Sequence, residues 1–289
     1  MEHLWLIFLF LFFILGATNS LMRRVLAQKF GDFNRLINGI FYVFFLIPAG
    51  ILLMLLFPPS LQVSTTDLII LLGGSIIWPL FNISAFQANK TVDAGIYTII
   101  ANLSPLFTLV IAYPFLNEEL TLVQYFGMLL LILSGSIAVS PSIKRNDRVM
   151  VWGVLWALLS AVLLGVGVAY ERFMLNRLDL GTYILFGWGF QVIWMAILAG
   201  KEWKYIAQLV RRVGHGTLFI WGSANALKSC CFILALLLSG SASLMSGATN
   251  FISIVIVIAA FFILNEREHL PQKILGTLVG ILGLFLIAF

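Results

Sequence analysis

The sequence contains few charged residues. Asp, Glu, Lys and Arg together make up 10% of its 289 residues, whereas apolar residues make up 61% and the mean hydropathy is +1.06. Soluble globular domains carry about 25% charged residues, so a soluble fold of this size is excluded. The composition predicts an integral membrane protein whose surface contacts the lipid bilayer.

Residue types that carry redox, metal or hydrolytic chemistry are also scarce. The two cysteines, Cys230 and Cys231, are adjacent within an apolar run, which fits neither a disulfide framework nor the spaced ligands of a metal site. The three histidines, His3, His215 and His269, fall near loops, and no Ser/His/Asp set can be assembled at one depth in a membrane. No metal or cofactor is expected, and an integral membrane enzyme is disfavoured.

The net charge of +5 raises the question of a nucleic-acid partner. The positive residues lie between apolar runs, where lipid headgroups account for them better than nucleic acid does. We therefore expect no nucleic-acid partner.

Ten apolar runs are long enough to cross about 30 Å of hydrocarbon, which takes about 20 residues of helix. Strands at this depth would leave backbone groups unpaired, so an all-α membrane fold with ten transmembrane helices is predicted. The runs are Leu4–Ser20, Leu36–Phe57, Leu68–Ala88, Ala94–Leu116, Leu120–Val139, Val151–Tyr170, Thr182–Gly200, Gly216–Leu238, Ser241–Leu264 and Leu270–Phe289.

The segment 93–140 occurs a second time near the end of the chain. At one constant offset the following residues coincide: Asn102 and Asn250, Leu116-Asn117-Glu118 and Leu264-Asn265-Glu266, Gln124 and Gln272, Gly135 and Gly283. We therefore predict two five-helix repeats, residues 1–140 and 151–289, joined by a cytoplasmic linker, residues 141–150. Because five is an odd number, the repeats are inverted relative to each other.

Basic residues are distributed unevenly between the two sides of the predicted bundle. Of the 17 Lys and Arg residues, Lys228 lies within a run, 14 fall on one side of the bundle, and only Arg172 and Arg177 fall on the other. Positive loops are typically cytoplasmic, so both termini are predicted to lie outside the cell or plasma membrane. The first run precedes its basic residues, the reverse of a cleavable signal peptide, and is expected to be a retained helix.

The stretch AGIYTIIANLSPLFTLVIAYPFLNEELTLVQYFGMLLLILSGSIAV, residues 94–139, has a proline in mid-helix, a Glu closing the fourth run and a Gln-x-x-Gly start to the fifth. In these features the chain resembles the EamA-type ten-helix transporters of the drug/metabolite transporter (DMT) superfamily. The resemblance implies inverted five-helix repeats, a central cavity lined by helices one to four and six to nine, and helices five and ten as outer support. It also implies transport of a small molecule. In the second copy Ser253 replaces Pro105.

Lys228 is the most informative polar residue. It lies near the middle of the eighth run, where an uncompensated cation costs about 3 kcal/mol or more. At helical spacing Trp221 and Asn225 share its face, and Ser229 lies beside it, so we expect this face to line a wet cavity. Lys228 would bind a carboxylate or phosphate of the substrate, with Trp221 as a stacking wall. Alternatively, Lys228 extends toward the interface or binds backbone carbonyls.

Other polar residues within the runs are further substrate-binding candidates. Trp78 and Asn82 repeat the Trp-x-x-x-Asn spacing of the eighth run, although Trp78 could instead anchor the helix at the interface. Asn102 and Asn250 either contact the substrate or bond a neighbouring helix. The remaining candidates are Asn19 and Tyr97, with Tyr170, Trp188 and Gln191.

No acidic residue falls in the middle of a run: Asp67, Asp93, Glu118, Glu171 and Glu266 all lie near run ends. A carboxylate proton relay is therefore not expected, and the sequence favours a facilitator or an exchanger that works by alternating access. Glu118 and Glu266 are interpreted as stabilising the starts of the following helices.

Two other functions stay open. The same fold could serve as a flippase for a lipid-linked phosphate or sugar, with Lys228 at the head group. A non-transporting membrane adaptor is the second alternative. In either case a monomer or a homodimer is expected.

Overall fold

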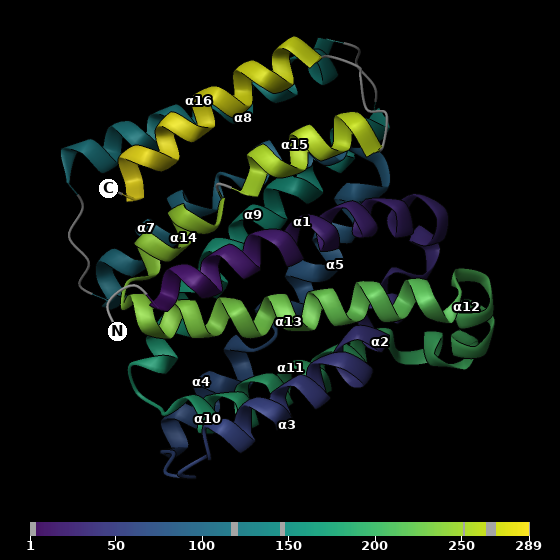
Figure 1. The fold of residues 1–289 in the computed structure, drawn as a ribbon, viewed down its shortest axis with the longest axis vertical. Coiled ribbons are helices and arrows are strands. Elements are labelled where there is room, and N and C mark those ends of the chain that lie inside the picture. Colours follow the sequence, from purple (N-terminus) through teal and green to yellow (C-terminus); the bar gives the residue numbers. More distant parts are fainter. Residues whose placement is uncertain (1–3, 117–120, 145–147, 251, 264–269, 289) are drawn as a thin grey trace.

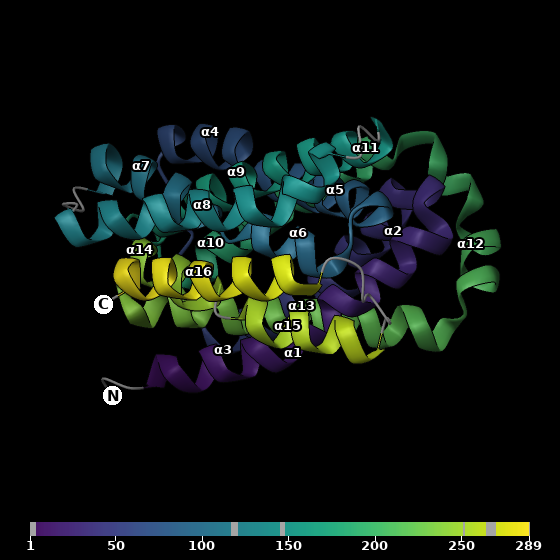
Figure 2. The ribbon, with the colours of Figure 1, turned by 90° about the horizontal axis from the view of Figure 1, so that it is seen from above.

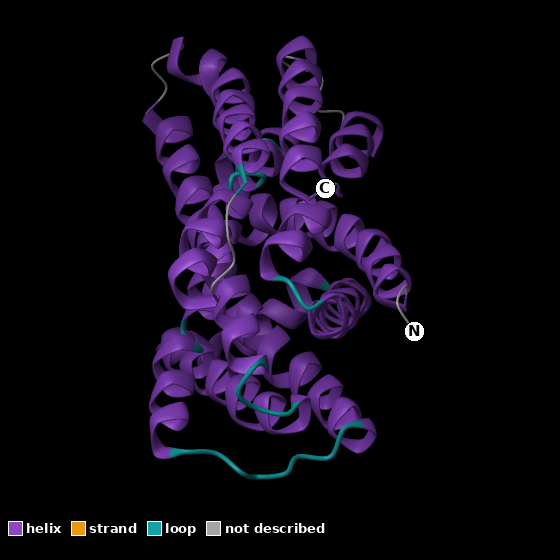
Figure 3. Ribbon diagram, turned by 90° about the vertical axis from the view of Figure 1, so that its left-hand side faces the viewer, coloured by secondary structure: helices purple, strands orange, loops and turns teal. Residues whose placement is uncertain are grey.

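The computed structural model describes residues 4–116, 121–144, 148–250, 252–263 and 270–288, and within these ranges all regular secondary structure is helical (Figure 3). The elements before the linker are α1 (Leu4–Phe30), η1 (Gly31–Phe33), α2 (Asn34–Phe41), η2 (Tyr42–Leu46), α3 (Ile47–Leu56), α4 (Thr65–Gly74), α5 (Ile77–Thr91), α6 (Ala94–Ala101), α7 (Ser104–Leu116) and α8 (Leu122–Lys144). Those after it are α9 (Arg148–Leu175), α10 (Leu180–Tyr183), η3 (Ile184–Trp188), α11 (Gly189–Ala199), η4 (Gly200–Tyr205), α12 (Ile206–Val213), α13 (His215–Ser239), α14 (Ala242–Asn250), α15 (Ile252–Ile263) and α16 (Leu270–Ala288).

Much of the described chain is long and apolar enough to cross a membrane. Large apolar side chains such as Leu52, Leu55, Phe126 and Leu129 face outward, as lipid contact requires. Six stretches among the described residues meet the length and hydropathy of a span: Leu4–Leu56, Thr65–Thr91, Ala94–Leu116, Val149–Leu175, Leu180–Val213 and His215–Ser239. Two shorter apolar helices cover Leu122–Ile137 and Pro271–Leu286. The all-α, multi-pass membrane class predicted from composition is confirmed.

Helices from the two halves of the chain pack against each other. α1 runs along α13, and α5 runs along α9. α8 and α16 lie side by side at one edge of the molecule (Figures 1 and 2). Small residues allow their close approach: Ser134 Oγ donates to Gly276 O at 2.7 Å, and a Cβ on Gly283 would lie 2.7 Å from Gly127 O.

Several apolar runs are interrupted rather than continuous. The fourth predicted run breaks at Asn102 and Leu103, between α6 and α7, close to Pro105, because proline disfavours a continuous helix before it. The third run also breaks, between α4 and α5, and η2 and η3 are π-helical segments inside the second and seventh runs. Such irregular turns often accompany functional sites in helical proteins.

The first predicted run ends too early. α1 continues from Ser20 to Phe30, so Arg23 and Arg24 lie within the helix and are buried. Arg24 Nη2 forms an ion pair with Asp93 Oδ1 at 3.2 Å. Both arginines were predicted to lie in a loop; they are helical because apolar Val25 and Leu26 continue the pattern beyond them.

Two segments expected to be loops are helical. α8 runs through Pro141 to Lys144 and α9 begins at Arg148, so the linker 141–150 is largely helical. α12 occupies the loop between the seventh and eighth predicted runs. Its Leu209 is buried, whereas Arg211 and Arg212 are exposed, and the positive φ of Gly200 and Gly214 (43° and 88°) bounds the segment from η4 to α12. α12 lies at the end of the molecule opposite the start of α1 (Figure 1).

The capping roles predicted for Glu118 and Glu266, beside Asn117 and Asn265, lie outside the described residues. The side chain of Asn250 also lies outside them.

Candidate substrate cavity

A cavity with about 1110 Å³ of empty space, including solvent at its mouth, lies between the two halves of the chain. Its lining comes from α1, α2, η2, α5, α6, α7, α9, η3, α11, α13, α14 and α15, and no described residue of α8 or α16 contributes. Its walls are largely aromatic: Phe12, Phe41, Trp78, Phe81, Trp188 and Phe232. Its size and apolar walls suit a small organic molecule.

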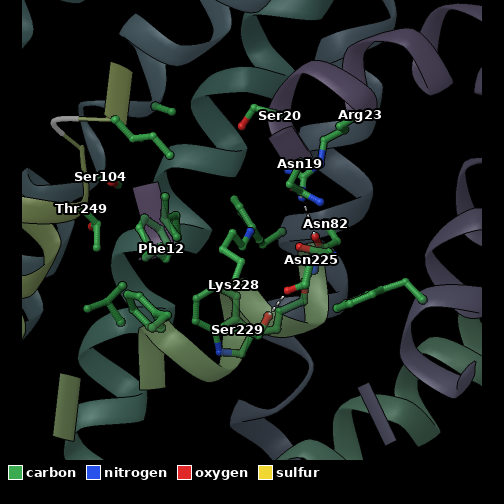
Figure 4. A pocket seen from close by; sticks show the side chains of 18 of the residues that line it. Phe12, Asn19, Ser20, Arg23, Asn82, Ser104, Asn225, Lys228, Ser229 and Thr249 are labelled. Atoms are coloured by element: carbon green, nitrogen blue, oxygen red, sulfur yellow. Dashed lines mark hydrogen bonds between the residues drawn. The ribbon is translucent and has the colours of Figure 1, made fainter. Parts of the chain in front are cut away.

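Lys228 projects from α13 into this cavity, between Phe12 and Asn19 of α1 (Figure 4). Lys228 lies beside Gly16 of α1: a Cβ added there would be in ordinary contact with Lys228 Cδ at 3.6 Å, whereas it would lie only 2.5 Å from Ile252 Cδ1. Among the described residues Lys228 has no hydrogen-bond or ion-pair partner. A cation in an apolar wall without a protein partner is expensive, which makes Lys228 the strongest candidate contact for an anion.

Arg23 is a second cation of the cavity, and it is held in place by amides. Arg23 Nη2 donates to Asn82 Oδ1 at 3.1 Å and to Asn19 Oδ1 at 3.4 Å, and the guanidinium lies 5.8 Å from the centre of the Phe81 ring. Asn82 Nδ2 in turn donates to Tyr42 Oη at 2.9 Å. Side chains of α1 and α5 therefore hold the guanidinium of Arg23, and Tyr42 of η2 holds Asn82 in turn.

Glu171 brings a carboxylate into the same cavity. It is 4% exposed and lines the cavity from α9. Its Oε1 accepts a hydrogen bond from Tyr183 Oη at 3.0 Å, and its Oε2 has no partner among the described residues. Glu171 lies near the end of its helix, as predicted, yet this position still brings its carboxylate to the cavity. Phe173, Met174 and Leu175 extend α9 beyond it.

Most of the unpaired polar atoms around the cavity are donors. Five N–H groups of lining residues are buried with no hydrogen-bond partner in the described part of the chain: Asn19 Nδ2, Arg23 Nε, Trp78 Nε1, Gln191 Nε2 and Asn225 Nδ2. Buried polar groups of native proteins are nearly always paired, so these donors, together with Lys228, indicate a ligand rich in acceptor oxygens.

Seven of the ten predicted substrate-binding residues line the cavity. They are Asn19, Trp78, Asn82, Tyr97, Asn225, Lys228 and Ser229. Of the three weaker candidates, Trp188 and Gln191 also line it, whereas Tyr170 does not and its hydroxyl donates to Leu71 O at 3.3 Å.

Two predicted contacts lie elsewhere. Trp221 is fully buried against Phe41, with ring centres 5.9 Å apart, and does not line the cavity; the stacking-wall position is wrong because this side of α13 faces α2. Asn102 Nδ2 donates to Ser253 Oγ at 3.1 Å, so Asn102 bonds a neighbouring helix, the alternative left open for it. Asn250, the third, falls outside the described side chains.

Arg23 and Glu171 are the residues that sequence reasoning missed. Both were assigned to run ends because each run was cut at its first charge. Two signals in the sequence identify them. The apolar pattern resumes after each charge, and Asn19 and Arg23 lie one helical turn apart.

Comparison with known proteins agrees with this architecture. A solved structure, "Crystal structure of protein", is 15% identical over 100% of this chain and 98% of that chain, with a TM-score of 0.63, which shows likeness of fold. No curated protein matches the chain. The profile of the EamA-like transporter family matches residues 3–140. The first half of the chain, residues 3–140, thus matches the EamA-like transporter family, which is part of the DMT superfamily.

Proposed function

We propose that the protein is a ten-span secondary transporter that moves a small metabolite with an anionic group through the central cavity by alternating access. The observation that carries this proposal is Lys228, a cavity cation without a protein partner among the described residues. The excess of unpaired donors around it supports the same substrate chemistry.

The lengths of the helical stretches support ten crossings. Leu4–Leu56 has 53 residues, about 80 Å of helix at 1.5 Å per residue, whereas one crossing needs about 30 Å. It therefore crosses twice, with the reversal at η1. Leu180–Val213 divides at η4, which leaves α12 outside the hydrocarbon. α8, the pair α14 and α15, and α16 supply the last three crossings.

Two inverted repeats are supported by matched contacts. The packing of α1 on α13 has its counterpart in the packing of α9 on α5. Gly16 in α1 lies against α15, and its counterpart Gly165 in α9 lies against α7, where an added Cβ would be 2.9 Å from Thr108 N. The two halves thus use the same close contact in exchanged roles.

The orientation proposed is with both termini outside the plasma membrane. Exposed basic residues gather around α12: Lys29, Arg35, Lys201, Lys204, Arg211 and Arg212. Cytoplasmic surfaces are typically positive, and α1 begins and α16 ends at the other end of the molecule (Figure 1).

The test is a thermal-shift screen of the purified protein against carboxylates, phosphorylated metabolites, amino acids, nucleosides, polyamines and organic cations. A ligand at ten times its Kd stabilises the protein by about 1.4 kcal/mol, a shift of a few degrees in Tm. We expect stabilisation by an anionic compound that is lost in Lys228→Met and retained in Lys201→Met, which removes an exposed lysine. Stabilisation by cations that persists in Lys228→Met would refute the proposal.

A further inference from the structure

Glu171 is the one carboxylate among the described residues that line the cavity, and the transport scheme above gives it no role. A buried carboxylate normally has an ion-pair partner or several donors. Glu171 has a single hydrogen bond, from Tyr183, and its Oε2 has none.

The groups that face Glu171 are uncharged. Tyr183 approaches from α10 and Tyr42 from η2, Tyr170 precedes it on α9, and the indole of Trp78 faces it from α5, outside hydrogen-bond geometry. None of these groups supplies a positive charge, so no neighbour fixes the carboxylate in its ionised form.

Neither of the two cations of the cavity is bound to Glu171 in the described part of the chain. Arg23 bonds Asn19 and Asn82, and Lys228 approaches Gly16 on α1. Neither forms an ion pair with Glu171 among the described contacts. Neither cation therefore holds Glu171 in its ionised form among the described contacts.

We propose that Glu171 is the proton-binding residue of the cavity, and that a proton on its Oε2 accompanies the anionic substrate through the membrane. This inference rests on the function proposed above. Protonation forms an O–H bond at Oε2, while Oε1 still accepts from Tyr183 Oη. No other bond changes, and the proton enters from and leaves to the solvent on whichever side the cavity opens.

Charge explains why the proton and the anion would bind together. With Arg23, Lys228 and an ionised Glu171 the lining has a formal charge of +1, and protonation of Glu171 makes it +2. An anion then binds more tightly, and by linkage a bound anion favours the protonated form by the same factor. Symport of an anion with a proton follows.

The experiment measures binding of two anion probes, benzoate and inorganic phosphate, by tryptophan fluorescence between pH 5.5 and 8.5. Trp78 and Trp188 line the cavity and report on occupancy. We expect probe affinity of the wild-type protein to fall about tenfold as the pH rises, within the usual range of coupling between sites.

The decisive variant is Glu171→Gln, which resembles the protonated acid in shape and charge. It is expected to bind the probe at pH 8.5 about tenfold more tightly than the wild type, with affinity independent of pH. Such a gain cannot arise from misfolding. Tyr183→Phe, which removes the hydrogen bond to Oε1, should retain the pH dependence and displace its midpoint.

The matched control is Glu202→Gln, a carboxylate in η4 that accepts from Leu36 N at 3.1 Å outside the cavity; it should behave as the wild type. Unchanged pH dependence in Glu171→Gln would overturn the inference. In a last case neither probe binds at any pH, but the pH dependence of tryptophan fluorescence without a probe differs between the wild type and Glu171→Gln. That outcome refutes the anionic substrate and supports proton binding by Glu171.

Discussion

The Asp93 ion pairs allow a quantitative test of how the described helices are held together. Asp93 precedes α6 and binds Lys273 of α16 at 2.8 Å and Arg24 of α1 at 3.2 Å. The Lys273 and Arg24 side chains are only 3% and 6% exposed, and Asp93 is 26% exposed. One carboxylate therefore serves two buried cations from helices distant in sequence.

Replacing Asp93 with Asn removes the carboxylate that both buried cations bind. Removal of one partner of a buried pair costs about 3–5 kcal/mol. Partial exposure of Asp93 and other bonds of the cations, such as that from Arg24 Nη1 to Asn89 O, lower our expectation to about 2–4 kcal/mol. At about 2–3 °C per kcal/mol for a chain of this size, Tm should fall by about 5–10 °C.

The assay is thermal unfolding of the purified protein in detergent, and Asp32→Asn is its control. Asp32 pairs with Lys90 at the same 2.8 Å, but the two side chains are 89% and 41% exposed, so this substitution should leave Tm unchanged. Equal shifts for the two variants would refute the reasoning that burial, rather than distance, sets the contribution of the pair.

Further predictions concern packing and capping. Gly165→Ala should destabilise the protein by about 1–3 kcal/mol, because the new Cβ meets the backbone of Ser104 and Thr108. Gly16→Ala should destabilise it less, because its Cβ meets only the end of the Ile252 side chain. Thermal unfolding of both variants checks this order. Asp179 caps α10 by accepting from Thr182 N at 2.8 Å. Burial raises the pKa of Asp179, but hydrogen bonds from Ser60 and Thr182 outweigh it and hold the pKa below its usual value. Asp179→Ala should therefore cost about 0.5–1 kcal/mol at pH 7, and the difference from wild type should disappear as the pH falls below the lowered pKa; equal differences at pH 7 and pH 3 would contradict this.

The helical fold was predictable because apolar runs of this length lie in lipid, where a helix satisfies all backbone hydrogen bonds within the segment. Span ends were less predictable, since a charge within a helix looks the same in sequence as a charge in a loop. Arg23 and Arg24 illustrate this: their cost is offset by Asn82 and by Asp93, residues 59 and 69 positions away. Asn225 and Lys228 line the cavity as predicted from their position on α13. Trp221 was predicted on the same face, but it packs against Phe41 of α2 instead.

Matched residues of the two halves differ in how their hydrogen bonds are satisfied. Asn82 and Asn225 both line the cavity from helices that carry the same Trp-x-x-x-Asn spacing. The amide of Asn82 is satisfied on both atoms, by Arg23 and by Tyr42. The amide nitrogen of Asn225 has no partner among the described residues, and one turn later Lys228 is also unpaired. An acceptor group of a ligand is therefore expected to bind near α13, while the α5 side orients Arg23 and contributes aromatic wall.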